Sequence, residues 1–222
     1  MSPGPISGVP GPVPPVAEPG LRVVPRGSGG DAITDAAREI FDERGYHGAS
    51  IRDIARRAGL SLSALYYWYP SKQSLLVAII EKSGLEYARI CDSHLSEAGT
   101  DPTRRLCALV AATVRYRVRH RVESAINASE WRNLEPDNRV RLEERQHAAT
   151  AVWSDVIDGG VRSGAFRCAH PEDARRSIQA ACNAVAQWYV PEFSAPGRGT
   201  VEVDELVQRY TAIALRIVDH PG

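Results

Sequence analysis

The chain has 222 residues, of which 43% are hydrophobic and 24% charged, as is ordinary for a globular protein with a sizeable core. Its 27 Lys and Arg balance 27 Asp and Glu, so the formal net charge is zero, and no apolar run reaches the length of a membrane span. Neutrality argues against a broad basic surface for nucleic acid, but an average over the whole chain hides local clusters.

Residues 1–30 differ in composition from the rest of the chain, because they contain eight prolines and seven glycines. Such a segment cannot bury enough apolar surface to offset its conformational entropy, so we expect a disordered tail. Arg22 and Arg26 could contact a nucleic-acid groove, although a solvated tail is the simpler interpretation. The segment lacks the basic start and apolar stretch of a secretion signal, and we expect a cytoplasmic, nucleoid-associated protein.

After this tail the pattern becomes helical. Apolar residues recur every three or four positions between residues 33 and 41, and Gly45 follows as a stop signal. Ser50 is a suitable N-cap for a short second helix, with Asp53 able to complete a capping box. A third short helix is predicted over residues 62–69.

Pro70 and Ser71 then break the chain and begin a long helix that carries Leu75 and Leu76. No strand-like alternation is long enough to compete, so we expect an all-α protein. Its domains would be a three-helix unit over residues 31–76 and a larger helical unit over 77–222. Further helices are predicted at about 102–121, 123–133, 136–160, 171–190 and 204–218, three of them beginning at Pro102, Pro136 and Pro171, with a Pro/Gly loop over 191–199.

Residues 50–69 carry the spacing that a helix-turn-helix requires. Ala55 falls where two helices cross and only a small side chain fits, Gly59 opens the turn, and Leu65 would fill the core beneath. An ordinary corner between two helices could show the same spacing. The three residues therefore favour a helix-turn-helix without excluding the corner.

A wider set of residues forms one pattern, without gaps, over about 45 residues. Its members are Phe41, Gly45, Tyr46, Ser50, Ile54, Ala55, Ala58, Gly59, Leu60, Ser61, Leu65, Tyr66, Pro70, Ser71, Lys72 and Leu75. This pattern resembles the N-terminal domain of TetR-family transcriptional regulators. Three positions depart from the family pattern: Ser63 stands where Gly is frequent, Tyr69 where Phe is usual, and Ser74 where an acidic residue is common. The first departure puts the base preference in doubt.

The resemblance implies that the helix over residues 62–69 enters the major groove of DNA, its N-terminus first. Tyr66 and Trp68 could instead belong to the core. Three consecutive aromatics span too much of a helix surface for all to be buried, however, and DNA contact gives a reason for their exposure. The candidate DNA-binding residues are Arg52, Ser61, Leu62, Ser63, Tyr66, Tyr67, Trp68 and Lys72.

The charge around this motif is locally basic. Between residues 51 and 73, Arg52, Arg56, Arg57 and Lys72 face one acid, Asp53, which gives 4 − 1 = +3. The preceding helix is acidic. The sequence therefore predicts a confined positive patch, with Lys72 beside a helix N-terminus as a phosphate contact.

Apolar residues in the last two predicted helices repeat at steps of three and four. The pattern suits a four-helix bundle formed by two protomers, and burial inside one protomer is the alternative. The resemblance implies a homodimer, and a two-fold dimer would read a palindromic operator. The candidate interface residues are Ile178, Ala181, Val185, Trp188, Leu206, Tyr210, Ile213 and Ile217.

The segment between the motif and these helices is the expected effector chamber. Its candidate ligand-binding residues are Leu109, Thr113, Asn127, Trp131, His147, Trp153, Asn183 and Gln187, and for the polar ones a role as satisfied core groups or plain surface residues is the alternative.

The C-terminal part shows a Gly160-x3-Gly164-x-Phe166 pattern followed by Cys182-Asn183 and Trp188-Tyr189-x-Pro191. It is similar to TetR-like regulators of fatty-acyl, sterol or aromatic-acid catabolism, and the resemblance implies release by an acyl-CoA-like ligand. Arg115, Arg117, Arg119 and Arg121 could meet the phosphates of such a thioester. Arginines two apart face opposite sides of a helix, however, so at most half could do so, and a solvated basic helix is the alternative.

We therefore expect a ligand-released transcriptional repressor that binds a double-stranded DNA operator as a homodimer and responds to an acyl-CoA or another small hydrophobic metabolite. We expect no membrane partner, cofactor, metal site or catalytic residue, because the chain has no HExxH motif, nucleophile motif or phosphate-binding glycine loop. The alternatives are an all-helical ligand-binding or interaction protein without DNA binding, and an enzyme.

Overall fold

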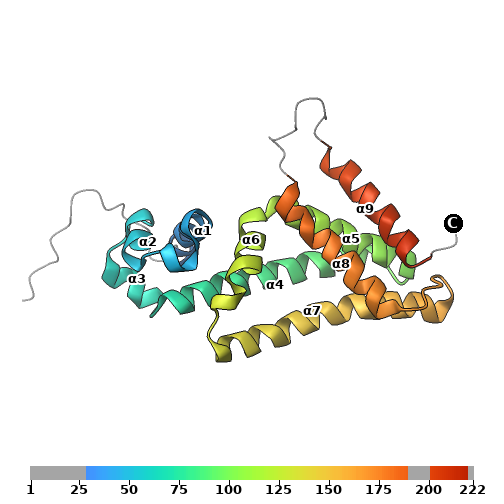
Figure 1. The fold of residues 1–222 in the computed structure, drawn as a ribbon, viewed down its shortest axis with the longest axis horizontal. Coiled ribbons are helices and arrows are strands. Elements are labelled where there is room, and N and C mark those ends of the chain that lie inside the picture. Colours follow the sequence, from blue (N-terminus) through green and yellow to red (C-terminus); the bar gives the residue numbers. More distant parts are fainter. Residues whose placement is uncertain (1–28, 190–200, 220–222) are drawn as a thin grey trace, which may run out of the picture.

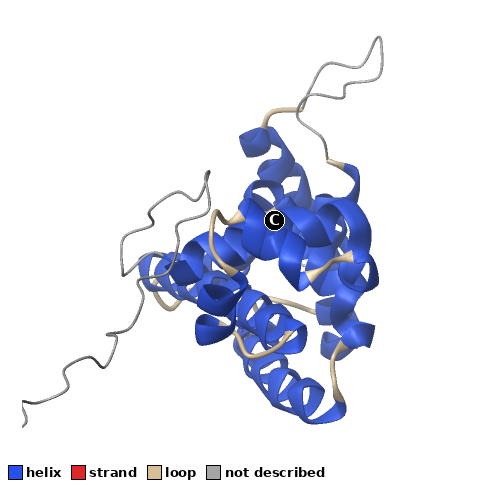
Figure 2. Ribbon diagram, turned by 90° about the vertical axis from the view of Figure 1, so that its left-hand side faces the viewer, coloured by secondary structure: helices blue, strands red, loops and turns tan. Residues whose placement is uncertain are grey.

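The computed structural model describes residues 29–189 and 201–219, which form α-helices, one short 3-10 helix and no strand (Figure 2). The all-α prediction is confirmed for this part of the chain. The predicted tail, up to residue 28, and the loop over 191–199 lie outside the described residues. Gly29 and Gly30, which we assigned to the tail, are the first two residues of a helix.

Three helices form the N-terminal unit: α1 (Gly29–Gly48), α2 (Ile51–Arg57) and α3 (Leu62–Trp68) (Figure 1). Gly45 has φ 67° and ψ 172°, so regular α-helical geometry is interrupted where a stop was predicted. Ser50 caps α2 by accepting a hydrogen bond from the Arg52 backbone N–H. Asp53 does not complete the expected capping box with Ser50, because its carboxylate pairs with Arg56 at 2.5 Å and with Arg44 at 3.4 Å.

The long helix α4 (Lys72–Ala98) leads away from this unit toward the rest of the molecule (Figure 1). Ser71 and Ser74 cap its start reciprocally, so Ser74 completes the capping box without a carboxylate. Residues 75–80 of α4 pack in the N-terminal core, whereas Cys91 and Leu95 pack in a second core. The expected division between residues 76 and 77 thus falls inside one continuous helix.

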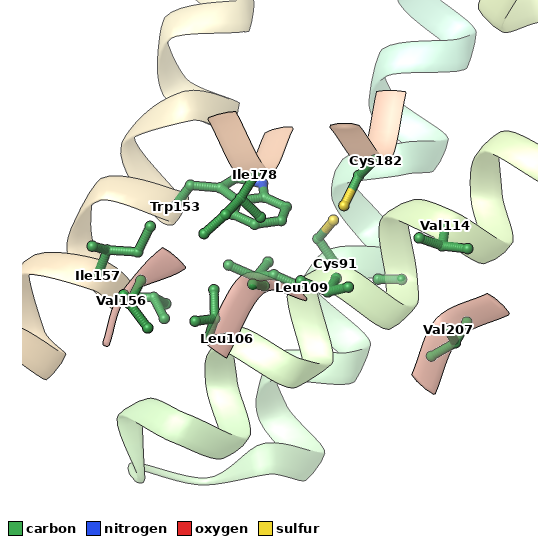
Figure 3. Close-up of a cluster of buried hydrophobic side chains, with 14 of the residues drawn as sticks. Cys91, Leu106, Leu109, Val114, Trp153, Val156, Ile157, Ile178, Cys182 and Val207 are labelled. Carbon is green, nitrogen blue, oxygen red and sulfur yellow. The ribbon is translucent and has the colours of Figure 1, made fainter. Parts of the chain in front are cut away.

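The second core lies among α4, α5, α7, α8 and α9 (Figures 1 and 3). Pro102, Pro136 and Pro171 each occupy a first helical position, as expected from the missing N–H of proline. The remaining elements are α5 (Pro102–Arg119), α6 (Arg121–Glu130), the 3-10 helix η1 (Trp131–Asn133), α7 (Pro136–Ser163), α8 (Pro171–Trp188) and α9 (Val203–Ile217).

The turn after α7 explains the spacing of Gly160, Gly164 and Phe166. Gly164 ends the helix in the left-handed conformation, φ 78°, and the Phe166 N–H donates to the Gly160 carbonyl at 3.1 Å. The buried Phe166 ring then lies over Gly160, where a Cβ would come within 2.0 Å of the ring. Gly160 is therefore required by close packing.

The four cysteines are free thiols, and the Cys91 and Cys182 side chains point toward each other across the second core (Figure 3). Burial raises the pKa of Cys91 to about 11 and that of Cys182 to about 12. Among the described residues, no helix combines the length and apolar character needed to cross a membrane.

Candidate nucleic-acid interface and ligand-binding core

The turn between α2 and α3 has the geometry that the sequence predicts. Gly59 adopts φ 71°, a conformation that favours glycine, and the Leu60 N–H donates to the Ala55 carbonyl at 2.9 Å. Ala55 and Leu65 are buried in the N-terminal core. Leu65 thus anchors α3 from below and directs its opposite face to solvent.

That outer face of α3 carries most of the candidate DNA-binding residues. Ser61 caps the helix by accepting from the Ala64 N–H, and Ser63 is exposed while Leu62 is half-buried. Tyr66 and Tyr67 are exposed by 49% and 84%. The structure therefore brings hydroxyl and aromatic groups together on one short helix, and it places Tyr66 outside the core.

Trp68 has a partly structural position. It is 42% exposed, and its indole lies over the first residues of α1, such that a Cβ on Gly29 or Gly30 would come within 3.0 or 3.1 Å of the ring. The Tyr67 ring meets the indole edge-on at a centroid distance of 5.8 Å. Trp68 therefore fastens α3 to α1 while keeping one part of its surface in solvent.

Two of the four basic residues of the patch, Arg56 and Arg57, are paired with neighbouring acids. Arg57 forms two hydrogen bonds of 2.6 and 3.0 Å with the Glu43 carboxylate, and this pairing lowers the pKa of Glu43. Arg56 pairs with Asp53. Arg52 is exposed and takes part in none of the ion pairs found within residues 29–189 and 201–219, which leaves it the best placed arginine of the patch for a phosphate.

Lys72 is held inside the N-terminal unit. Its Nζ donates to the carbonyls of Tyr46 at 2.7 Å and Ala49 at 3.0 Å, and it lies 4.4 Å from the centre of the Tyr46 ring. Burial lowers the pKa of this ammonium group. Lys72 thus ties the start of α4 to the α1–α2 connection, and one of its three N–H donors is left for a phosphate contact.

The candidate interface on α8 and α9 divides into two sets. Ile178, Val185 and Leu206 are no more than 3% exposed in a single protomer, because they pack into the second core. In the single protomer these three residues have almost no surface left for a partner. Burial within one protomer, the alternative for this apolar pattern, accounts for them.

The other interface candidates remain accessible. Trp188 and Ile213 are 52% and 47% exposed, and Ala181, Tyr210 and Ile217 are half-buried. The Trp188 and Tyr210 rings stack at a centroid distance of 6.4 Å, which joins the two helices into one surface. Small residues extend this surface along α8 through Ala180 and Ala184.

Buried polar groups gather between α4, α5 and α7. The hydroxyls of Tyr87 and Thr113 are hydrogen-bonded at 2.8 Å, Trp153 donates its indole N–H to Tyr87 at 3.4 Å, and Thr113 also donates to the Leu109 carbonyl. Burial is the main cause of the raised pKa of Tyr87. Leu109, Thr113 and Trp153 thus lie in the same region of the fold.

A second cluster of hydrogen-bonded side chains connects α4 with α5 and α6. Tyr116 donates to the Ser83 carbonyl at 2.8 Å, and Asn127 donates to the Ser83 hydroxyl at 3.4 Å. The Asn127 side-chain oxygen is buried and has no hydrogen-bond partner among the described residues. A buried acceptor of this kind is available to a ligand or water.

The other ligand candidates lie elsewhere. Trp131 packs against the N-terminal core, and His147 and Gln187 are exposed on the surfaces of α7 and α8. Asn183 is also exposed, and its side-chain oxygen accepts from Arg117 at 3.0 Å. The structure therefore does not gather Trp131, His147 and Gln187 in the polar cluster around Thr113, because helical periodicity gives a face but not the neighbour that covers it.

Sequence reasoning missed three polar members of this region, Ser83, Tyr87 and Tyr116. One signal was present: Ser83 and Tyr87 stand four residues apart on α4, so they share a face of that helix. A polar pair at this spacing between apolar residues indicates a polar patch inside a helical core.

The α6 region contacts the N-terminal unit directly. Arg38 of α1 pairs with Glu123 of α6. Gln73 donates to the Asn133 carbonyl at 3.1 Å, and His47 is hydrogen-bonded with the Asn133 side chain at 2.8 Å. Two routes, α4 and the α6–η1 segment, therefore connect α1–α3 with the polar core.

Comparison with known proteins gives matches over both regions. The family model described as bacterial regulatory proteins, tetR family, matches residues 33–79. The family model described as tetracyclin repressor-like, C-terminal domain, matches residues 99–218, which is more than half of the 222 residues.

Similar proteins cover most of the chain. The HTH-type transcriptional repressor KstR2 of Rhodococcus jostii (strain RHA1) is 28% identical over 185 residues, 82% of this chain and 87% of the relative. A bacterial regulatory protein in the tetR family from Rhodococcus RHA1 superposes with a TM-score of 0.77 at 24% identity, over 87% of this chain and 98% of that one. AibR, in complex with isovaleryl coenzyme A and operator DNA, superposes with a TM-score of 0.74 at 21% identity, over 87% and 100%. At these identities the two structures support the fold alone.

Proposed function

The chain belongs to the TetR family of bacterial regulatory proteins, and from this premise we propose that it is a DNA-binding repressor released by a ligand. The observation that carries the proposal is the exposed face of α3, with Tyr66 and Tyr67 directed outward above the buried Leu65. A contiguous patch of exposed aromatic side chains marks an interaction site, and a major groove accepts a helix of this size.

In the proposed complex, α3 inserts with Ser61, Leu62 and Ser63 toward the base edges. The serine hydroxyls donate or accept hydrogen bonds, and Leu62 offers apolar contact such as that to a thymine methyl. Tyr66, Tyr67 and Arg52 contact phosphates on either wall of the groove. Since most other basic residues of the patch are already paired, we expect weak non-specific binding and a strong dependence on the specific contacts.

We propose that two protomers associate through α8 and α9. The exposed surface that supports this contains Trp188, Ile213, Tyr210 and the small residues Ala181 and Ala184. Small side chains allow two helices to approach closely, while Trp188 and Ile213 supply buried area. A two-fold dimer presents two copies of α3, so the operator is expected to be an approximate palindrome.

The proposed effector is an acyl-CoA or another small hydrophobic metabolite that binds among α4, α5, α6 and α7. Support comes from the hydrogen-bonded hydroxyls of Tyr87 and Thr113 and from the buried side-chain oxygen of Asn127, which lie beside an apolar core. The acyl-CoA class follows AibR, which shares the fold and was solved with isovaleryl coenzyme A. Ligand binding would shift α4 and the α6–η1 segment and so change the spacing of the two reading helices. A difference in affinity of about 3 kcal/mol between the two states lowers operator binding about 100-fold.

We propose that this function involves binding and no catalysis, and that it takes place in the cytoplasm on chromosomal DNA. The support is membership of a family of regulators. An all-helical binding protein that does not contact DNA remains the alternative that the experiment below tests.

The proposal is tested by selecting bound fragments from random DNA. We expect enrichment of a near-palindrome, and absence of enrichment would contradict DNA reading. Arg52→Gln should then weaken binding to all sequences about equally and lower the salt dependence by about one phosphate contact, whereas Ser63→Ala should change the base preference. Arg104→Gln, an equal charge change on the exposed start of α5, serves as the matched control and should leave binding unchanged.

A further inference from the structure

Arg117 of α5 is half-buried, whereas Arg115 and Arg119 on the same helix are exposed. Its guanidinium carbon lies 5.2 Å from the centre of the Tyr87 ring and 5.3 Å from that of Tyr116. Its Nε donates to Asn183 at 3.0 Å and its Nη1 to the Ser124 hydroxyl at 3.1 Å. All these partners are uncharged.

The guanidinium of Arg117 has no acidic partner at ion-pair distance in the described part of the chain. None of the ion pairs formed within the described ranges includes Arg117, whereas Arg115, two residues earlier on the same helix, pairs with Asp204 at 2.7 Å. A half-buried guanidinium that has only neutral partners retains its affinity for an anion, and its planar donors suit a carboxylate or a phosphate.

A second arginine lies beside it. The Nε of Arg121 donates to the Ala186 carbonyl of α8 at 3.2 Å, one helical turn from Asn183, and no ion pair within the described part of the chain includes Arg121. Both guanidinium groups therefore border the same stretch of α8. Because Asn183 is exposed, this edge is open to a ligand from solvent.

The inner side of Arg117 faces the second core. The guanidinium lies over the Tyr87 ring, and Tyr87 packs against that core. The charge of Arg117 also opposes the increase in the pKa of the Cys182 thiol that burial causes. Cys182 in turn packs among apolar side chains (Figure 3). A cation at the edge and an apolar core behind it match an amphipathic ligand, anionic at one end and hydrophobic at the other.

We propose that Arg117, assisted by Arg121, binds an anionic group of the effector, either a carboxylate or a phosphate of a CoA thioester. This inference rests on the proposed ligand-controlled function and assigns the charged end of the effector to the edge of α8. The uncharged partners Ser124 and Asn183 hold the guanidinium in place without neutralising it.

The test measures ligand binding by calorimetry and thermal shift without DNA. The probes are isovaleric and decanoic acids as free carboxylates, as CoA thioesters and as uncharged methyl esters. We expect an anionic form to bind at least about 10-fold more tightly than the matching ester. Preference for the free acid would identify a carboxylate ligand, and preference for the thioester would identify a phosphate.

Arg117→Gln should weaken binding of the anionic form about 10- to 100-fold and leave the ester unaffected, and Arg121→Gln should act in the same direction with a smaller effect. Arg117→Lys keeps the charge and should retain part of the preference. Arg119→Gln removes an equal charge from the exposed side of α5 and is the matched control.

Equal binding of ester and anion, equal effects of Arg117→Gln and Arg119→Gln, or no binding of any probe would overturn the inference. A change of oligomeric state in Arg117→Gln and Arg121→Gln, with anion binding retained, would instead assign these arginines to the protomer interface and would also overturn it. Since DNA is absent from the assay, such a failure leaves the operator selection unaffected, and the two proposals fail separately.

Discussion

The reading helix α3 and the helix pair α8–α9 both present large apolar side chains to solvent, but the rest of each surface differs. Helix α3 has one buried leucine and exposes three aromatics beside hydroxyl groups. Helices α8 and α9 bury Ile178, Val185 and Leu206 of their apolar repeat in the protomer, and they expose Trp188 and Ile213 beside alanines. The first surface offers hydrogen bonds as well as contact area, which suits DNA. The second offers a smooth apolar face, which suits another copy of the protein.

This difference shows that the exposure of an apolar residue indicates a binding surface better than its place in a helical repeat does. The regular three- and four-residue steps of α8 mark the side that packs against α5, and that side is already covered. Trp188 belongs to the same repeat, but its side chain is 52% exposed and stacks on Tyr210 of α9. On each surface, substitution of a buried residue should lower the free energy of unfolding, whereas substitution of an exposed residue should weaken binding to the partner.

The largest effect is expected at the anchor of α3. Leu65→Ala removes a fully buried side chain and should lower the free energy of unfolding by about 3 to 4 kcal/mol, measured by urea denaturation. Tyr67→Ala should change stability by less than about 0.5 kcal/mol and still weaken operator binding about 10-fold. An equally large loss of stability in Tyr67→Ala would mean that the exposed face of α3 is not reserved for a partner.

The corresponding pair on the C-terminal surface is Ile178 and Ile213. Ile178→Ala should lower the free energy of unfolding by about 3 kcal/mol, because it opens a cavity in the second core. Ile213→Ala should leave the fold of the protomer intact and raise the dimer dissociation constant about 10-fold, measured by analytical ultracentrifugation. If Ile178→Ala changed dimerisation without destabilising the protomer, the division of α8 and α9 into core and interface would be incorrect.

A smaller effect is expected where α7 ends. Gly160→Ala places a Cβ against the Phe166 ring and should destabilise the protein by about 2 kcal/mol in thermal or urea unfolding. Gly159 is the matched control, since the nearest atom to a Cβ there is the end of Arg162 at 3.9 Å. Gly159→Ala should be neutral or stabilise the helix by up to about 1 kcal/mol. Similar losses in both variants would exclude close packing as the cause.

The smallest effect concerns alkaline pH and the second core. Burial raises the pKa of Cys182 to about 12, whereas an unfolded thiol ionises near 9, so the folded state keeps its proton while the unfolded state loses it. Stability is therefore lost as pH rises above 9. Between pH 7 and pH 10, wild type should lose about 1 kcal/mol more than Cys182→Ala, measured by urea unfolding at each pH. The same pH dependence in both proteins would contradict a buried, protonated thiol.

Much of the N-terminal unit could be predicted from local patterns. The helix stop at Gly45, the caps at Ser50 and Ser71, and the buried Leu65 depend on residues within a few positions of one another. The role of Lys72 could not be predicted in the same way, because the carbonyls that hold its ammonium belong to a different helix and a connection 23 or more residues earlier. The compensation of Arg57 by Glu43 likewise depends on packing between α1 and α2.

The C-terminal region was less predictable for the same reason. Helix starts at Pro102, Pro136 and Pro171 were correct, since they depend on the fixed φ and missing N–H of proline. The polar cluster around Tyr87 and Thr113 joins residues 26 positions apart, and no local signal pairs them. Helical periodicity defines a face, but packing between distant elements decides whether that face meets the protomer core, a second copy or solvent.

By itself the sequence determined the helical class, the turn of the helix-turn-helix and the aromatic content of the reading helix. These features follow from short-range rules of capping, backbone freedom and side-chain size. Only the tertiary structure decided which apolar residues of α8 and α9 remain exposed and which arginines are neutralised. It also placed Arg117 beside two tyrosine rings without an ion-pair partner in the described part of the chain. Those outcomes depend on long-range packing, which sets the burial and the neighbours of each charge.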